Sequence, residues 1–438
     1  MTMERDHYRA EFESQAFAPG PAWLKPIRRK AMDRFLDLGF PTTRDEEWKY
    51  TNVAPIARLP FRYAANGSNQ VTKDVLFHFT FGDAVPNQLV FINGRLSKQW
   101  SKLGNLPSGV QATSLSETWE SERKVLEDHF QDSAGTDAFY DLNTSFFEDA
   151  ALVVLPKGTV LSEPIHLMFV SAPGQNETVS YPRIFLCLEE GSKATVIESY
   201  FGLDHQIYFT NSVTESFLEN GAALDHYKIQ RESETAYHVS SHRVRQERNS
   251  LFSSHSISLG AAITRNDITS VLAAEGADCT LNGLYMVSGK QLVDNHTTID
   301  HAKPHGTSRE LYKGILDEEA RGVFNGKILV RKDAQKTNAQ QTNRNLLLSE
   351  HALVDTKPQL EIHADDVKCA HGATIGQLDE EALYYLRARG VGLEAARNLL
   401  TYAFGNELVH DIPVAPVRVN LECLLASRFA QTHHKSAA

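Results

Sequence analysis

The chain has 438 residues, 42% of them hydrophobic and 23% charged, and carries a formal net charge of −11 at pH 7. This length allows two or three structural units, each with a core of its own. The 44 basic residues are interspersed with 55 acidic ones, which excludes a primary nucleic-acid surface, because binding phosphates requires clusters of Lys and Arg.

The N-terminal region, residues 1–150, is predicted to be mixed and mainly helical. It starts with MTMERDHYRAEFESQ, which is charged from its fourth residue on and has no apolar run, so no secretory signal is expected. Between Pro21 and Phe40 apolar residues recur at helical spacing, and Gly39 provides a stop. A polar helix is expected within DEEWKYTNVAPIARL, a short strand at residues 89–94, and a further helical run between Ser114 and Phe147.

The pattern of residue types changes at Ala151, and residues 151–376 are predicted to be all β. Short β-prone runs such as RIFLCLEE, ATVIESYFG and LFSSHSISLG follow one another, and no convincing helix interrupts them. Turn signals separate the runs, at Glu190-Gly191, Asn220-Gly221, Glu275-Gly276, Ser288-Gly289 and Asn325-Gly326. Such a region is either a large sandwich or a stacked solenoid, and without a strict repeat motif the residues leave both open.

Residues 377–438 return to helical patterns and are predicted to form a small helical domain. One stripe of the helix expected in LDEEALYYLRARG carries its apolar residues, Leu378, Ala382, Leu383 and Leu386. VGLEAARNLLTYAFGNELV gives a second amphipathic stretch, and PVAPVRVNLECLLASRFAQ, with prolines at its start, gives a third.

Standard catalytic and nucleotide-binding signatures are missing from the sequence. The nearest approach to a phosphate-binding loop, GLYMVSGKQ at residues 283–291, has five residues instead of four between its glycines and a Gln where the magnesium-binding hydroxyl should be. No GxSxG, HExxH or strand-turn-helix GxGxxG is present. No window approaches the roughly 18 consecutive apolar residues of a membrane span, so no membrane association is expected.

Cysteines and histidines supply the candidates for metal chemistry. The four cysteines are far apart and form no CxxC pair, a pattern typical of reduced thiols in a cytoplasmic protein; they are Cys187, Cys279, Cys369 and Cys423. Three histidines, His296, His301 and His305, crowd into DNHTTIDHAKPHG. We interpret them as polar groups of loops and strands that are hydrogen-bonded to the backbone.

Cys369 and His371, in ADDVKCAHGATIG, form the pair of greater interest. On a strand, residues two apart project from the same face, so a thiolate and an imidazole would lie side by side and could share a soft metal or sulfur species. Two ligands are an incomplete site, since tetrahedral binding needs four, and the others would have to come from elsewhere in the chain or from a partner subunit. The alternative is structural, because a buried Cys usually behaves as a small hydrophobe.

Several long blocks between Val293 and Gly390 resemble the shared core of the SufB/SufD family of iron-sulfur cluster assembly proteins. They read VDNHTTIDHAKPHGTSRELYKGIL, GVFNGKILVRKDAQKTNAQQTNRNLLLS and DTKPQLEIHADDVKCAHGATIGQLDEEALYYLRARG, in the order of the family. The N-terminal DEEWKYTN, residues 45–52, is similar to the segment typical of the SufD branch. The resemblance therefore extends over nearly the whole chain and is weakest between residues 65 and 180.

Two positions favour the SufD branch over the SufB branch. In SufB-type sequences a Cys stands four residues before a T-x-P, where this chain has Ala352 before Thr356-Lys357-Pro358. SufB-type sequences also have a Glu directly after the His that corresponds to His371, where this chain has Gly372.

The resemblance implies a mainly β fold, a right-handed parallel β-helix flanked by helical N- and C-terminal domains. It also implies a non-catalytic scaffold of the SUF system that pairs with SufB through the β-helix and docks the SufC ATPase through residues 377–438. Cys369 and His371 then match a Cys-x-His that faces SufB, so that an iron-sulfur cluster or persulfide could be held transiently between the two subunits. In the isolated chain no tightly bound cofactor is expected, and a homodimer is a further expectation.

Three alternative functions remain open besides this one. A polysaccharide lyase or hydrolase on a β-helix would need paired carboxylates or basic residues on a groove, and usually a secretory signal. A subunit that uses reduced flavin to deliver electrons or mobilise iron is the second, although no feature of the sequence identifies a flavin site. The third is a SufB-like or duplicated homodimeric scaffold that acts without a SufD partner, and Ala352 and Gly372 speak against it.

Overall fold

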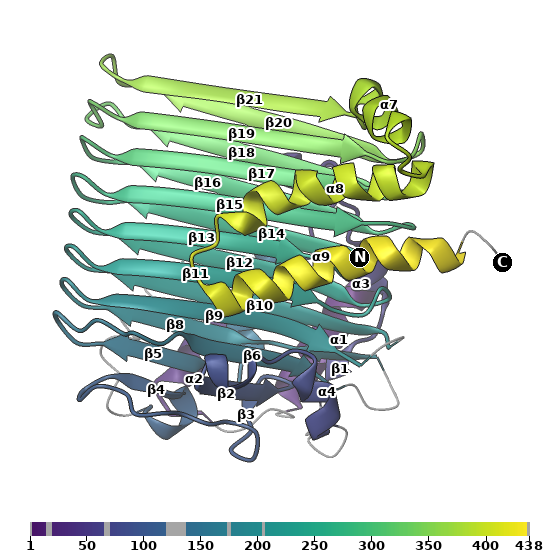
Figure 1. Ribbon diagram of the computed structural model, residues 1–438. Coiled ribbons are helices and arrows are strands. Elements are labelled where there is room, and N and C mark those ends of the chain that lie inside the picture. The colour runs from purple at the N-terminus through teal and green to yellow at the C-terminus, as the bar shows by residue number, and fades with distance from the viewer. Residues whose placement is uncertain are drawn as a thin grey trace.

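The computed structural model describes residues 2–14, 20–64, 71–119, 137–172, 177–203 and 206–435. Its central part is a right-handed parallel β-helix, with helices near both ends of the chain, as predicted (Figure 1). Each turn of the chain contributes one strand to each of two facing sheets, and strands that are neighbours in a sheet run parallel. Of the two architectures that the residues left open, the solenoid is therefore confirmed.

The two sheets, which we call sheet A and sheet B, face each other across the interior of the β-helix. Sheet A contains β8 (Arg183–Leu188), β10 (Tyr208–Leu218), β12 (Tyr237–Gln246), β14 (Ile263–Leu272), β16 (Leu292–His301), β18 (Arg321–Val330) and β20 (Leu353–Ile362). Sheet B contains β9 (Lys193–Gly202), β11 (Ala223–Arg231), β13 (Leu251–Ser258), β15 (Asp278–Val287), β17 (Thr307–Leu316), β19 (Asn338–Leu347) and β21 (Lys368–Gly376). The register continues from strand to strand: Ile263 pairs with Leu292, which pairs with Arg321.

Shorter strands close the first end of the β-helix. They are β1 (Arg62–Tyr63), β2 (Asn87–Ile92), β3 (Arg95–Leu96), β4 (Gln111–Ser114), β5 (Ala151–Leu155), β6 (Ile165–Ser171) and β7 (Thr178–Ser180). The strand predicted at residues 89–94 is β2, which extends sheet B. At the outer limits of the two sheets, β3 and β4 run antiparallel to their neighbours and so end the solenoid pattern.

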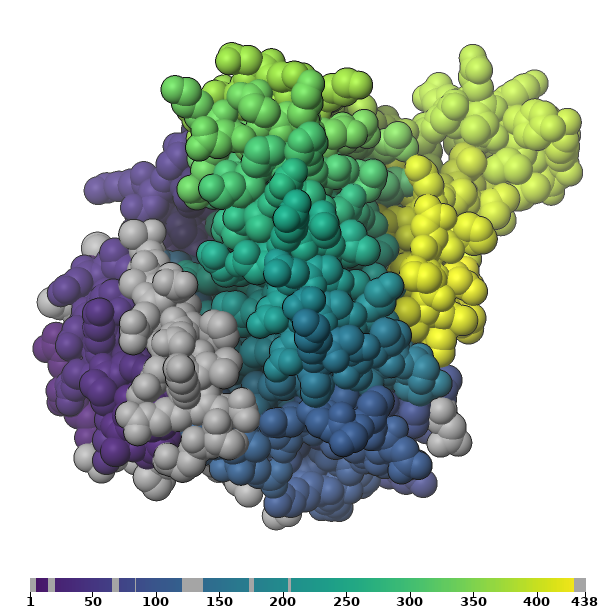
Figure 2. All heavy atoms as spheres, turned by 90° about the vertical axis from the view of Figure 1, so that its left-hand side faces the viewer, coloured from purple at the N-terminus to yellow at the C-terminus, as the bar shows by residue number. Residues whose placement is uncertain are grey.

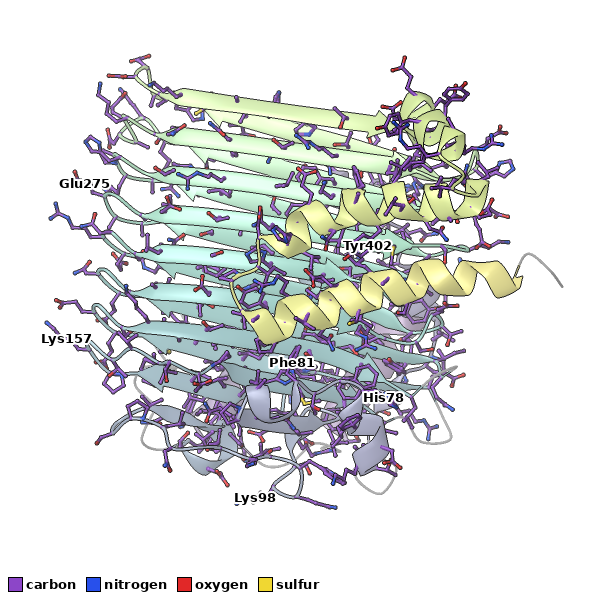
Figure 3. All side chains as sticks on the ribbon, in the orientation of Figure 1. His78, Phe81, Lys98, Lys157, Glu275 and Tyr402 are labelled. Atoms are coloured by element: carbon purple, nitrogen blue, oxygen red, sulfur yellow. The ribbon has the colours of Figure 1, made fainter. Side chains whose placement is uncertain are left out.

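One edge of the β-helix is a stack of tight turns, each with one residue of positive φ. These residues are Gly158, Gly191, Gly221, Asn249, Gly276, His305 and Lys336. Each donates its backbone N–H to a carbonyl of the next turn, as Gly191 does to Asn220 and Gly276 does to Pro304. Lys157 and Glu275 lie on this edge and point away from the sheets (Figure 3).

Most of the predicted turn signals are confirmed, and one is wrong. Gly191, Gly221, Gly276 and Gly289 have positive φ, a conformation that L-residues with a Cβ avoid. Asn325-Gly326 instead lies in the middle of β18. A Cβ on Gly326 would lie 2.3 Å from Nε2 of Gln341 in the facing sheet, so close packing requires this glycine.

The interior of the β-helix contains both apolar and polar side chains. Inward-facing apolar residues of both sheets, such as Leu218, Leu224 and Phe252, form one cluster. Inward-facing polar side chains hydrogen-bond from sheet to sheet: Nζ of Lys228 on β11 donates to Oδ1 of Asn266 on β14 at 2.8 Å. Polar residues at inward-facing positions, and apolar residues that face outward beneath the helices, remove the clean alternation of apolar and polar residues from the sequence.

Helices of the N-terminal region cover the outer face of sheet A. They include α1 (Thr2–Glu13), α2 (Leu24–Leu38), α3 (Ala54–Arg58) and α6 (Ala138–Phe146). Their aromatic residues Phe35 and Phe139 share a cluster with Phe209 of β10 and Val239 of β12. The short helix α4 (Lys73–Phe77) instead packs beside β2 and β6.

The helices predicted in this region are confirmed in part. α2 is the helix expected between Pro21 and Phe40. The polar helix expected in residues 45–59 is a 3-10 turn, Glu46–Trp48, followed by α3. Within the run from Ser114 to Phe147 the structure describes a 3-10 turn, Leu115–Glu117, and α6, while residues 120–136 lie outside the described residues.

The C-terminal helices α8 (Leu393–His410) and α9 (Ala415–Lys435) lie along the outer face of sheet B (Figure 1). Leu408 and Leu421 of these helices share a core with Tyr227 and Ile257 of the sheet. They therefore lie on the side of the β-helix opposite the N-terminal region (Figure 2). α7 (Glu380–Ala388) follows β21 and stands out from this body, and each of its residues is at least partly exposed.

Candidate functional site

The second end of the β-helix is open. Sheet A ends at β20 and sheet B at β21, and within the described residues no further strand pairs with either of them. The outer edge of each strand therefore presents unpaired backbone N–H and C=O groups, which is the arrangement that another chain can extend. Large apolar side chains are exposed on this last turn, including Leu353 at 58% and Ile375 at 48%.

Cys369 and His371 both lie on β21, at this open end. The register places Cys369 beside the buried Ala339 and His371 beside the buried Gln341 of β19. Residues two apart on a strand share a face, and Cys369 packs against the cluster of Ile328, Val330 and Ala339, so this face is the interior one. The structure thus brings the predicted pair together at the mouth of the β-helix.

The two side chains differ in their surroundings. Cys369 is half-buried, and burial raises the pKa of its thiol, while a backbone hydrogen bond from Ala339 acts in the opposite direction. His371 is exposed. A thiol with a raised pKa is a poor nucleophile on its own but becomes a thiolate when a metal ion coordinates it.

Cys369 and His371 are two candidate ligands at the mouth. Among the residues that the structure describes there is no group of three or more His, Cys, Asp or Glu side chains arranged to hold a metal ion. A thiol and an imidazole are nevertheless the donor types that iron, zinc and iron-sulfur clusters accept. The shared site inferred from the sequence, with further ligands from elsewhere, stays a prediction.

Two polar residues beneath His371 were missed by sequence reasoning. Gln341 of β19 and Glu310 of β17 are register partners, both are buried inside the β-helix, and Nε2 of Gln341 donates to Oε2 of Glu310 at 2.7 Å. Burial raises the pKa of Glu310 to about 7, against the effect of hydrogen bonds from Thr297 and Gln341. The only signal in the sequence is that each lies at an inward-facing position of its strand, and this position is known only once the register is known.

A second polar network fills the middle of the interior. Oε1 of Glu198 lies 2.9 Å from Nε2 of His226 and accepts from Oγ1 of Thr214 at 2.9 Å, while Oε2 accepts from the hydroxyl of Tyr200. Burial alone would raise the pKa of Glu198, but the charges and hydrogen bonds around it lower this pKa to about 2. Burial lowers the pKa of nearby Lys228 to about 8. These groups are buried and paired with one another, which is typical of a structural network.

The three histidines of DNHTTIDHAKPHG do not converge. His296 faces outward between Glu47 and Asp294, and His301 faces inward with Nε2 2.9 Å from Oγ of Ser308. His305 occupies the positive-φ position of a turn, at φ 59°. These histidines are therefore polar groups of strands and a turn, but the expected backbone partners are wrong, because His296 and His301 meet side chains instead.

The other sequence features considered above can also be compared with the structure. GLYMVSGKQ ends β15 and turns directly into β16, without the helix that a phosphate-binding loop requires. The four cysteines form no disulfide bond with one another. None of the helices that the structure describes is both long and apolar enough to cross a membrane.

Exposed apolar side chains also gather on α7 and at the start of α8. Tyr384 is 75% exposed and Tyr385 56% exposed, and Leu393 and Leu399 are exposed to 43% and 50%. Asp379 caps the N-terminus of α7 by accepting hydrogen bonds from the backbone of Glu381 and Ala382. A stable helix that exposes aromatic residues next to the open end is a second surface suited to binding a protein.

Comparison with known proteins gives consistent matches over nearly the whole chain. The family model described as "SUF system FeS cluster assembly, SufBD core domain" matches residues 169–404, and that of the "SufBD protein N-terminal region" matches residues 6–167. An iron-sulfur cluster assembly SufBD family protein of Synechocystis sp. is 35% identical over 92% of this chain and 90% of its own length. The iron-sulfur cluster assembly proteins SufD of Escherichia coli and of Bacillus subtilis are 32% and 24% identical, over 88% and 92% of this chain and 89% and 93% of their own lengths.

Proposed function

The chain belongs to the SufBD family of iron-sulfur cluster assembly proteins, and from this membership we propose that it is a non-catalytic scaffold subunit that pairs with SufB through the open end of its β-helix. The observation that carries this proposal is the unpaired last turn, β20 and β21, with Cys369 and His371 at its mouth. A partner whose own solenoid ends in the same way would continue both sheets and cover Leu353 and Ile375.

Cys369 and His371 would then face the partner across the joint. Iron or a nascent iron-sulfur cluster is the cargo of such a site and not a resident cofactor of this chain. The imidazole of His371 would supply one ligand and Cys369 a second, while SufB would supply the others. Covering the mouth would also remove water, which strengthens every electrostatic interaction in the site.

The C-terminal helices are proposed to dock the SufC ATPase. Tyr384, Tyr385 and Leu393 offer an exposed apolar surface on and beside α7, as protein interfaces require. α8 and α9 are fixed on sheet B, so a force applied to α7 would reach the last turn of the β-helix through α8 and β21. We place the protein in the cytoplasm with its partners, and expect no tightly bound cofactor in the isolated chain; an absorption spectrum of the purified complex tests for flavin.

Co-expression with SufB and SufC counterparts, followed by the mass of the purified assembly, tests the partners. The wild-type chain should enter a complex that contains both proteins. Ile375→Lys places a charge on the β21 edge and should abolish SufB binding, whereas Leu251→Lys, at a residue 50% exposed on β13, should not. Tyr384→Ala should weaken SufC binding and leave SufB bound, whereas Phe77→Ala, at a residue 70% exposed on α4, should change neither.

Point substitutions are preferred to truncation because removing α8 and α9 would expose the apolar outer face of sheet B. A wild-type chain that binds neither counterpart would overturn the scaffold function. If the complex forms, His371→Ala should assemble normally and lower the yield of iron-sulfur cluster, and a wild-type yield from that variant would remove His371 from the site.

A further inference from the structure

His371 is the uppermost member of a column of polar side chains on successive strands of sheet B. The register pairs His371 of β21 with Gln341 of β19, and Gln341 with Glu310 of β17. All three lie at inward-facing positions, because Gln341 meets Gly326 of the facing sheet and bonds to Glu310 beneath it. The column therefore runs from the mouth of the β-helix into its buried interior.

One oxygen of this column is buried and has no partner. Gln341 is 1% exposed. Within the part of the chain that the structure describes, Oε1 of Gln341 has no hydrogen-bond partner, whereas the Glu310 carboxyl group interacts with Gln341 and Thr297. A buried acceptor left without a donor costs about 1–3 kcal/mol, which indicates that a donor reaches Oε1 of Gln341 in another state of the protein.

The fold makes room for the Gln341 amide in one orientation. Nε2 of Gln341 donates to Glu310, one strand below, which leaves Oε1 as the amide atom free to accept from the strand above. Gly326 makes the space, since a Cβ at that position would lie 2.3 Å from Nε2 of Gln341. Glu310 and Gly326 together thus fix the side of the amide that His371 would meet.

We propose that Gln341 is a positioning residue for His371, accepting a ring N–H of His371 at its Oε1 while Glu310 holds the amide in place. A histidine that ligates a metal almost always donates its other ring N–H to such an acceptor, which fixes the tautomer and the ring orientation. The ring of His371, exposed in the isolated chain, turns toward Gln341 when the partner covers the mouth. This inference rests on the proposed function, in which His371 is a ligand of the cargo.

The test uses the assembled complex, with Co²⁺ as a spectroscopic probe for iron. Titration of the complex with Co²⁺ gives an affinity and a visible ligand-field spectrum that reports the coordination geometry. Gln341→Leu should weaken Co²⁺ binding by about 10- to 100-fold, the usual effect of losing such an acceptor, and should alter the spectrum. The exchanged pair, Glu310→Gln together with Gln341→Glu, keeps one donor and one acceptor between the two residues and an acceptor oxygen for His371, and should retain binding close to that of the wild type.

Two further variants distinguish a positioning role of Gln341 from a general effect on folding. Gln246→Leu removes another buried Gln of the interior and should leave Co²⁺ binding unchanged, which separates positioning from general damage to the β-helix. If Gln341→Leu fails to fold, Gln341→Asn shortens the side chain by one methylene, which moves the amide from its place against Gly326 and Glu310 but keeps it inside, and should show the same loss.

The outcomes distinguish the inference from the proposed function. If His371→Ala loses Co²⁺ binding while Gln341→Leu or Gln341→Asn binds like the wild type, the positioning role is wrong and the ligand role of His371 stands. If His371→Ala binds Co²⁺ like the wild type, or if the wild-type complex binds none, the ligand role fails and the positioning role fails with it.

Discussion

Nδ1 of His296, on strand β16, lies 3.2 Å from a carboxylate oxygen of Glu47, which belongs to the N-terminal segment DEEWKYTN. Nε2 of the same ring lies 3.1 Å from Asp294. The segment makes further contacts with sheet A: Lys357 of β20 binds Glu46, and Arg265 of β14 lies over the ring of Trp48 at 4.3 Å. It therefore forms a strap across the outer face of sheet A that reaches the open last turn.

The strap should loosen as pH rises. Burial and Arg265 lower the pKa of His296, but Asp294 and Glu47 outweigh them and hold it above 6.5. A raised pKa means that the contribution of His296 to stability is complete below pH 6.5 and lost as pH rises through the pKa of the folded protein. The pKa of Glu47 is lowered, chiefly by its hydrogen bond with His296, so its own contribution is lost at acid pH instead.

We expect His296→Gln to remove about 1 kcal/mol of stability at pH 6 and almost none at pH 8.5. Thermal unfolding of both proteins between these pH values provides the measurement. The same change at the exposed His363 is the control and should leave the pH profile as it is. Identical pH profiles for His296→Gln and the wild type would show that His296 does not hold the strap.

Glu198→Ala should destabilise the β-helix by about 3–5 kcal/mol, because it leaves Lys228 and His226 buried without their carboxylate. Denaturant unfolding at pH 7 measures the loss, with the exposed Glu219→Ala expected within about 0.5 kcal/mol of the wild type. The lowered pKa of Glu198 adds a pH signature: its contribution is present above pH 4.5 and lost as pH falls toward 2. A loss below 1 kcal/mol would contradict a tightly paired network.

Lys313→Met should release α8 from sheet B. Nζ of Lys313 donates to the carbonyl of Phe404 at 2.7 Å and pairs with Glu407 at 2.5 Å, and Met keeps the apolar stem without the charge. We expect a loss of about 1–2 kcal/mol and faster amide exchange in α8, measured by hydrogen exchange. Lys290→Met, at an exposed surface pair, should exchange like the wild type; equal exchange in both variants would mean that the apolar contacts alone hold α8.

The turn stack predicts opposite effects for two substitutions. Gly276→Ala forces a Cβ onto a residue with φ 75°, 2.3 Å from Oδ1 of Asn249, and should cost about 1–3 kcal/mol. His305→Gly removes a Cβ from a residue with φ 59° and should leave stability unchanged or raise it by about 1 kcal/mol. Thermal unfolding compares the two. A loss of several kcal/mol from His305→Gly would mean that its imidazole has a role beyond the turn.

Much of the fold could be predicted from local patterns and family resemblance. The β-prone runs from Ala151 onward and the glycines at Gly191, Gly221 and Gly276 indicated an all-β region of short strands, because turn glycines depend on local backbone conformation. The choice of a solenoid came from the resemblance, since some inward-facing residues are polar and some outward-facing ones are apolar, and alternation along a strand does not identify which strands pair. Asn325-Gly326 was misread for the same reason, as its glycine serves a contact with the distant Gln341.

At the site, the sequence pointed to Cys369 and His371 because residues two apart on a strand share a face, and no register is needed for that inference. Gln341 and Glu310 could not be found in this way. They reach His371 only through the pairing of three strands, and their spacing in the chain depends on the lengths of the turns between those strands. The packing of α8 and α9 on sheet B depended likewise on which strand face was left uncovered.

The open last turn has a consequence for how much of this protein a cell can keep in a usable form. In the proposed pairing with SufB, the final strands, which carry unpaired donors and acceptors beside Leu353 and Ile375, are covered only when that second chain binds. Molecules made in excess of the partner would find their most abundant match in one another, and self-pairing would withdraw them from assembly. Output of the system should therefore follow the ratio of the two subunits during synthesis and not the total amount of either.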